Sequence, residues 1–208
     1  MARPSSAHKI LEQAALLFAE HGYSGTIMDD LAELAKVNKA TIYYHFKDKE
    51  NLYEEVLVRH FIALVDAIIE SVEAQTDVIK RLEAYIKTFA LESSKRRTLT
   101  SILMREIAGG GDKLPNRAKA QMHRVLMLVK SILDQGEKEA LFVKTNVLTV
   151  HMMVVGSLSF YITSEPMRKM MVSSDPAVQN SFQKSTVEEL SEEIYTMVKN
   201  ALLNKKES

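Results

Sequence analysis

Residues 39–49 concentrate side chains that can hydrogen-bond to phosphate oxygens and to base edges. Thr41 and His45 are four residues apart, so they share one face of a helix. An α-helix fits the major groove of B-form DNA, where short polar side chains reach base edges while Tyr hydroxyls and Lys ammonium groups hold the flanking phosphates. The sequence therefore predicts a DNA-binding helix that carries Lys39, Thr41, Tyr43, Tyr44 and His45, followed by Lys49. The plainer alternative is a solvated helix with two aromatic packing residues.

Two short helices joined by a tight turn must position these side chains. Thr26 and Asp29 have the spacing of a capping box, which predicts that the first helix opens at Thr26. Residues 36–38 leave too little room for a strand, and Ile42 and Phe46 resume the helical spacing of apolar residues. The pattern is that of a helix-turn-helix. The apolar face of its first helix is predicted to hold Ile27, Leu31, Leu34 and Ala35.

This segment resembles the DNA-binding signature of the TetR family of transcriptional repressors. The matching residues, in the first quarter of the chain, are Thr26, Leu31, Ala32, Thr41, Tyr43, Tyr44, His45, Phe46, Lys49 and Leu52. The resemblance implies phosphate contacts from Thr26, Tyr43, Tyr44 and Lys49, and base-edge contacts from residues near Lys39, Thr41 and His45. Lys36 stands where the family often has Gly. If the turn needs a left-handed residue there, Lys costs about 1 kcal/mol relative to Gly.

The overall charge does not draw the chain to nucleic acid, because 27 basic residues balance 27 acidic ones. The positive charge is local instead: Lys36, Lys39, Lys47 and Lys49 face a single acidic residue, Asp48, between positions 36 and 49. A local patch of this kind suits a site-specific binder.

Several classes of site and location are disfavoured by composition. The chain has no cysteine, which excludes disulfides, thiolate zinc sites, iron–sulfur clusters and cysteine nucleophiles, and no cofactor is expected. The first nine residues lack the apolar core of a signal peptide, so we expect a cytoplasmic protein. The longest apolar stretch, 147–162, contains polar residues and falls short of the ~20 residues that span a bilayer, so it predicts a helix buried in protein and no membrane partner.

Every periodic segment is helical, which predicts an all-α protein of about nine helices. A three-helix head, whose first helix spans 6–21 and stops at Gly22, should be joined by a long helix over 48–75 to a C-terminal helical domain for ligand binding and dimerisation. The predicted boundaries are 1–48 and 49–208. Segment 163–184 shows no clear pattern, whereas Ser185 and Glu188 predict a capping box for the last helix.

The second domain differs in composition, since nine of the eleven methionines follow residue 100. Methionine suits cavities for apolar ligands of varying shape, although at helical spacing it more often fills gaps in a core. The candidate effector-binding residues are Tyr85, Phe89, Met104, Met122, Met153 and Phe160. Met167, Met170 and Met171, with His151, form a weaker alternative as a soft-metal site, because such sites usually include thiolates.

The helices near 147–162 and 187–203 have more apolar surface than a small bundle must hide, which predicts a homodimer through them. The leading hypothesis is a repressor that leaves a pseudo-palindromic operator when a small, largely apolar effector binds the second domain. The alternatives are an enzyme, for which no catalytic constellation stands out, and a helical adaptor without DNA binding. The sequence does not identify the effector, the operator or the regulated genes, nor does it separate a repressor from an activator.

Overall fold

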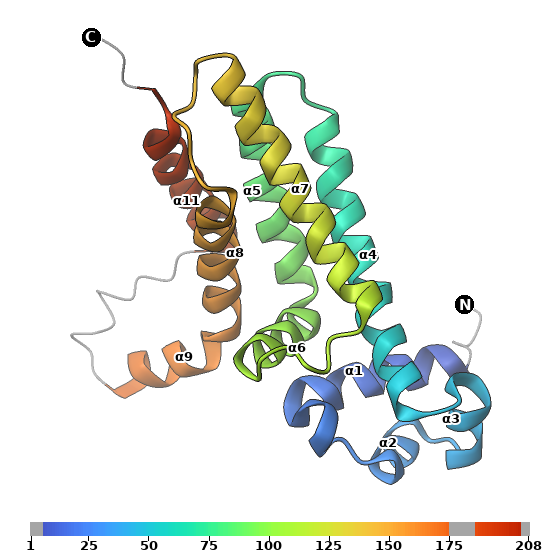
Figure 1. The fold of residues 1–208 in the computed structure, drawn as a ribbon. Helices are drawn as coiled ribbons and strands as arrows, with labels where there is room; N and C mark the ends of the chain where they lie inside the picture. Colours follow the sequence, from blue (N-terminus) through green and yellow to red (C-terminus); the bar gives the residue numbers. More distant parts are fainter. Residues whose placement is uncertain (1–5, 175–185, 205–208) are drawn as a thin grey trace, which may run out of the picture. The chain divides into compact units, whose positions relative to one another are not determined.

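The computed structural model describes residues 6–174 and 186–204, and the all-α prediction is confirmed for them. These residues form ten helices and no named strand, with one isolated bridge between Phe142 and Leu203. The helices, labelled in Figure 1, are α1 (Ser6–Gly25), α2 (Met28–Ala35), α3 (Lys39–Phe46), α4 (Lys49–Glu73), α5 (Val78–Lys95), α6 (Arg97–Ala108), α7 (Asn116–Lys138), α8 (Val147–Thr163), α9 (Glu165–Ser174) and α11 (Val187–Leu202).

Contacts divide the chain into two compact units. The first comprises Met1–Ala63 and Thr98–Gln121, and the second comprises Leu64–Arg97 and Met122–Ser208. Residues of α4 and α7 belong to both units. The functional boundary predicted between residues 48 and 49 stays a prediction.

In the first unit, α1, α2 and α3 contact one another and form a three-helix head (Figure 1). Their apolar side chains are buried together because each short helix has only one stripe to hide. The stripe of α2 differs from the predicted one: Met28, Leu31 and Ala35 are buried, while Ile27 is 55% and Leu34 52% exposed. The helix starts at Met28, and from there the spacing of three and four residues selects Leu31 and Ala35.

Gly22 interrupts α1 near the place where its end was predicted. Its backbone angles, φ 71° and ψ 178°, lie where a side chain is strained, and the helix bends there before it ends at Gly25. The side chain of Arg105 approaches closely, since a Cβ on Gly22 would lie 3.0 Å from Arg105 Cδ. Arg105 also donates to the carbonyl of Glu20 over 2.8 Å, which satisfies one of the open carbonyls at the bend.

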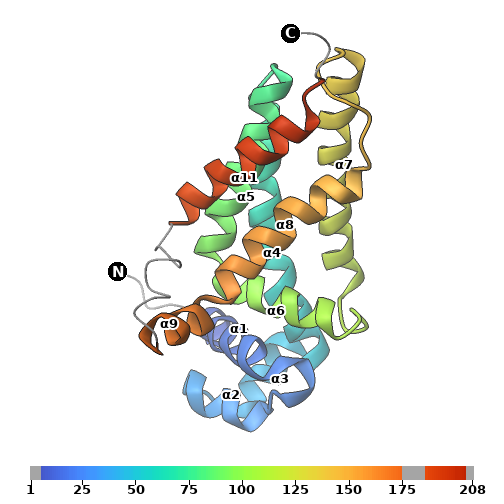
Figure 2. The ribbon, with the colours of Figure 1, turned by 90° about the vertical axis from the view of Figure 1, so that its left-hand side faces the viewer.

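In the second unit, α5, α8 and α11 pack against one another (Figures 1 and 2). The predicted capping box of the last helix is wrong by one residue, because Thr186 and Glu189 form it. Ser185 lies outside the described residues. Part of the segment without a clear pattern, 163–184, forms α9, in which Pro166 occupies the first turn, where proline is tolerated.

At the end of α7, Gly136 lies against the ring of Phe142, so a side chain at position 136 would overlap that ring.

No single helix among residues 6–174 and 186–204 is long and apolar enough to cross a bilayer. The bent pair Val147–Thr163 and Glu165–Met171 reaches that length and composition only when its two helices are taken together.

Candidate nucleic-acid interface

The turn between α2 and α3 is closed by a left-handed residue. Lys36 has φ 54° and ψ 48°, so the position normally suited to glycine carries a lysine. The amide of Val37 donates to the carbonyl of Ala32 over 3.0 Å, which completes the C-terminal cap of α2. Asn38 then starts α3, because its side chain accepts a hydrogen bond from the amide of Ala40 over 2.9 Å.

Helix α3 buries Ile42 and Phe46 and turns its polar residues outward. Tyr44 is 84% and Tyr43 41% exposed, and His45 is exposed as well. An apolar stripe of only two residues therefore anchors the helix and leaves the aromatic and polar side chains accessible. Thr41 and Lys39 are half-buried on the same short helix. The structure thus brings five of the seven predicted DNA-binding residues together on α3.

Lys39 is already paired within the protein. Its ammonium nitrogen lies 2.9 Å from a carboxylate oxygen of Asp29, on α2. The hydrogen bond from the ammonium group to Asp29 raises the pKa of Lys39. Lys39 therefore stays charged, but part of that charge is balanced by Asp29 before any other anion arrives.

Thr26 does not cap α2, so this prediction is wrong. Its hydroxyl donates to the carbonyl of Gly22 over 2.8 Å, and the side chain is buried. Ile27 occupies the N-cap position, and no side chain caps the helix there. The hydroxyl proton is taken by the carbonyl left open at the bend of α1, so Thr26 ties α1 to the start of α2.

Lys49 opens α4 next to an aromatic ring of α1. Its ammonium nitrogen lies 4.8 Å from the ring centroid of Tyr23 and 3.5 Å from the carbonyl oxygen of Ser24. Partial burial lowers the pKa of Lys49. As predicted, Asp48 caps α4: its carboxylate accepts from the amide of Asn51 over 2.8 Å, and this hydrogen bond lowers the pKa of Asp48.

The sequence did not predict two contacts of the lysines: that of Lys49 with the ring of Tyr23 and that of Lys39 with the carboxylate of Asp29. Tyr23 and Lys49 are separated by 26 positions, as their numbers show, so no local spacing connects them. Asp29 was assigned to a cap, whereas its carboxylate reaches Lys39 across the turn. The available signal for that pair was the change from acidic residues at 29, 30 and 33 to lysines at 36 and 39.

The six predicted effector-binding residues fall in different environments. Tyr85 and Phe89 are buried in α5, where the hydroxyl of Tyr85 lies 3.2 Å from Nδ1 of His151. Met153 is 44% and Phe160 60% exposed on α8. Met104, in the first unit, and Met122, in the second, are half-buried. Their role in binding an effector stays a prediction.

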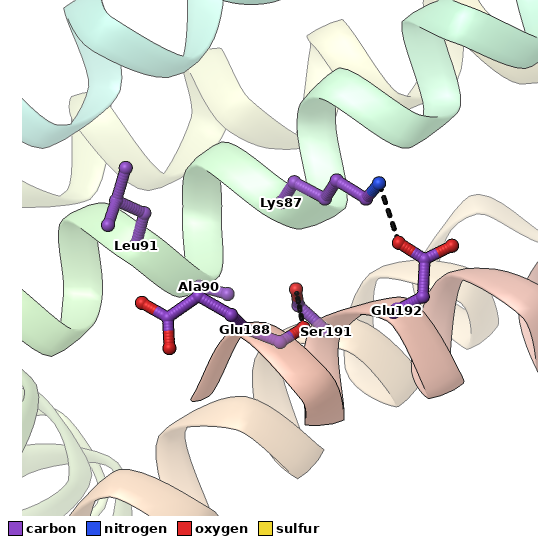
Figure 3. A pocket seen from close by; sticks show the side chains of 6 residues that line it. All are labelled: Lys87, Ala90, Leu91, Glu188, Ser191 and Glu192. Carbon is purple, nitrogen blue, oxygen red and sulfur yellow. Dashed lines mark hydrogen bonds and ion pairs between the residues drawn. The ribbon is translucent and has the colours of Figure 1, made fainter. Parts of the chain in front are cut away.

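A hollow of about 250 Å³ opens between α5 and α11 (Figure 3). Its walls are Lys87, Ala90 and Leu91 on α5 and Glu188, Ser191 and Glu192 on α11, and none of these is a predicted effector-binding residue. The ammonium group of Lys87 lies 2.6 Å from the carboxylate of Glu192 and 2.5 Å from that of Glu83. The hollow therefore combines a largely apolar lining with the ion pair of Lys87 and Glu192.

Metal binding finds little support in the described residues, where no group of three His, Cys, Asp or Glu side chains could hold an ion. The weaker methionine alternative relied on His151, which is buried on α8 with one ring nitrogen bonded to Tyr85. Met167, Met170 and Met171 are exposed on α9.

Comparison with known proteins places the head in a family. The sequence model described as "Bacterial regulatory proteins, tetR family" matches residues 10–56. A negative transcriptional regulator of the biofilm operon icaADBC, IcaR of Staphylococcus aureus, is 33% identical over 88 residues, which are 42% of this chain and 47% of IcaR. IcaR of Staphylococcus epidermidis is 35% identical over 63 residues, 30% of this chain and 34% of that protein. The chain therefore spans about half the length of the curated relatives it matches, or less.

The fold as a whole matches solved regulators. A tetR-family regulatory protein from Rhodococcus RHA1 has a TM-score of 0.78 at 14% identity over 98% of this chain and all of that one. The fatty acid degradation regulator FadR from Bacillus halodurans has a TM-score of 0.72 at 19% identity over 96% and 97% of the two chains. Both proteins are described as regulators. The family match covers residues 10–56, and these solved structures show that the chain as a whole has the fold of such regulators.

Proposed function

We propose that the chain is a DNA-binding transcriptional repressor whose α3 enters the major groove. The observation that carries this proposal is the exposed face of α3, where Tyr43, Tyr44 and His45 lie outward while Ile42 and Phe46 anchor the helix. Thr41 and His45 read base edges, and the tyrosine hydroxyls and Lys49 hold phosphates. Thr26, whose hydroxyl is used internally, acts by fixing the start of α2.

The operator is a pseudo-palindrome bound by a homodimer. Support comes from α8 and α11, which pack side by side and still expose large apolar side chains: Leu148, Met152, Met153, Phe160 and Met197. In soluble proteins, an exposed apolar face of this kind is usually covered by a partner protein. A two-fold dimer through these helices would set its two recognition helices about 34 Å apart, one turn of DNA.

A small, largely apolar effector releases the repressor from DNA. The second unit offers buried aromatic residues, Tyr85 and Phe89, with one polar pair, Tyr85 and His151, that could orient a ligand. Release requires that the effector bind the DNA-incompetent state more tightly, by about 1 to 3 kcal/mol for useful coupling. DNA binding and regulation of this kind place the protein in the cytoplasm.

The test begins with the full-length chain and its binding to genomic fragments in a gel shift, with random duplex as competitor. A helical adaptor would show no preference for any fragment. For a preferred fragment, Lys49→Ala should weaken binding to all sequences and flatten the dependence of log affinity on log salt by about one. Thr41→Ala and His45→Ala should instead relax the choice of sequence. Lys119→Ala, which changes an exposed lysine on α7, is the matched control.

If affinity, salt dependence and sequence preference are unchanged in the Lys49, Thr41 and His45 variants, the assigned surface is refuted. Dimerisation is checked separately by sedimentation: Phe160→Glu on α8 should yield monomers that keep the helical content of the parent. A dimer that withstands this change would place the interface elsewhere.

A further inference from the structure

A hydrogen bond joins the first residue of α1 to the exposed face of α3. The hydroxyl oxygen of Ser6 lies 2.8 Å from Nε2 of His45, although 39 positions separate the two residues. The ring of His45 also meets the ring of Tyr44 edge to face, with centroids 5.3 Å apart and planes at 73°. Ser6, His45 and Tyr44 therefore form a connected row on the surface proposed to meet DNA.

The chemistry of the pair allows Ser6 to act beyond His45. A serine hydroxyl has one proton to donate and two lone pairs that accept, whereas each imidazole nitrogen either donates or accepts. If Nε2 of His45 carries its proton, it donates to the Ser6 oxygen and the hydroxyl proton is left for another acceptor. A phosphate is acceptor-only, so its approach favours this arrangement over the reverse one.

We propose that Ser6 is a further residue of the DNA-binding surface, which accepts from Nε2–H of His45 and donates its hydroxyl proton to a phosphate oxygen of the duplex. The inference rests on the proposed function and deepens it. His45 would then have two contacts within the protein: its Nε2 is bonded to Ser6, and its ring packs edge to face with the ring of Tyr44.

Three variants of the full chain separate this role from a general effect on the head. Ser6→Ala removes both hydrogen bonds and should weaken operator binding about tenfold, as expected for a hydrogen bond to a charged group. The loss should be the same on every sequence and leave the salt dependence unchanged, because the lost group is neutral. Ser6→Thr keeps the hydroxyl and should restore binding. Ser24→Ala, at an exposed serine in the same unit, should bind like the parent.

The phosphate contact is tested with operators in which single phosphates are replaced by uncharged methylphosphonates. When the phosphate that Ser6 contacts in each half-site is replaced, the difference in operator affinity between the parent chain and Ser6→Ala should disappear, because the acceptor of the hydrogen bond is already gone. If the difference persists at every substituted phosphate, the contact with phosphate is refuted even if Ser6→Ala binds weakly.

The direction of the Ser6–His45 hydrogen bond is tested by the ¹⁵N shifts of the His45 ring in the complex. A proton on Nε2 is expected; a neutral ring with its proton on Nδ1 would overturn the inference. The outcomes also separate the two proposals. A parent chain that prefers no genomic fragment removes the proposed function itself, whereas a parent that binds its operator no better than Ser6→Ala removes only the role of Ser6.

Discussion

The ammonium nitrogen of Lys39 and the carboxylate of Asp29 lie 2.9 Å apart, so an ion pair bridges the two helices of the helix-turn-helix. Lys39 belongs to the helix proposed to enter the groove, and Asp29 belongs to the helix before it. Both side chains are substantially solvent-exposed, so the pair itself adds little to folding stability. Its larger effect concerns DNA, since a phosphate must compete with Asp29 for the same ammonium group.

Removal of the carboxylate should therefore strengthen DNA binding. We expect Asp29→Asn to raise affinity several-fold on all sequences at low salt, because Lys39 then pairs with a phosphate. The slope of log affinity against log salt concentration should become steeper by about one. Asp30→Asn, the exposed neighbour, controls for the change in net charge and should leave the slope unaltered. Both variants are measured by fluorescence anisotropy over a range of salt concentrations. Weaker binding by Asp29→Asn would show instead that the pair orients α3.

Within the first unit, Tyr53 on α4 donates its hydroxyl proton to the carboxylate of Glu106 on α6 over 2.5 Å, and both residues are buried. Burial and this hydrogen bond raise the pKa of Tyr53, so it remains a donor. Tyr53→Phe leaves a buried carboxylate without that donor and should cost about 1 to 3 kcal/mol in the free energy of unfolding, measured with urea. A combined Tyr53→Phe and Glu106→Gln variant should recover part of the loss. An unchanged midpoint for Tyr53→Phe would mean that water replaces the hydroxyl.

The absence of a side chain at Gly136 allows the ring of Phe142 to pack against the end of α7. A Cβ there would lie 2.0 Å from a ring carbon of Phe142, which is buried. Gly136→Ala should thus destabilise the second unit by about 1 to 3 kcal/mol despite the better helix propensity of alanine. Thermal unfolding followed by circular dichroism measures the effect. The combination with Phe142→Leu should unfold at a higher temperature than Gly136→Ala alone; if it does not, the clash is not the cause.

The head could be predicted from sequence because its information is local. The two helices of the motif and the turn at Lys36 follow from spacings of three and four residues, and the structure confirms them. The left-handed conformation of Lys36 was raised only as a condition, from a resemblance in which glycine often occupies the same place, and the structure shows that the condition is met. Local rules also predicted that Asp48 caps α4.

The wrong predictions of helix caps arise where two partners are possible and residue spacing alone cannot decide between them. Thr26 has the right distance from Asp29 for a capping box, but the bend at Gly22 presents a carbonyl that takes its hydroxyl proton. The last helix begins one residue later than predicted because Thr186 also has a glutamate three positions ahead. Contacts between distant positions, such as Ser6 with His45, follow from packing and have no local signature.

The buried pair of Tyr85 and His151 should make the second unit sensitive to acid. Burial lowers the pKa of His151 below its usual value of 6.5, so the unfolded chain binds a proton at a pH where the folded chain does not. Stability from the neutral ring is thus fully present above pH 6.5 and is lost as the pH falls toward the folded pKa.

We expect the free energy of unfolding of the parent chain to decrease below pH 6.5 relative to that of His151→Gln, whose side chain has no proton to gain. Urea unfolding at several pH values between about 5 and 8 gives both curves, and their difference removes the titration of other groups that the substitution leaves unchanged. His123→Gln, at an exposed histidine on α7, is the matched control and should follow the parent. Parallel curves for the parent chain and His151→Gln would mean that the ring takes up its proton equally in the folded and unfolded states, so that burial does not disfavour its charged form.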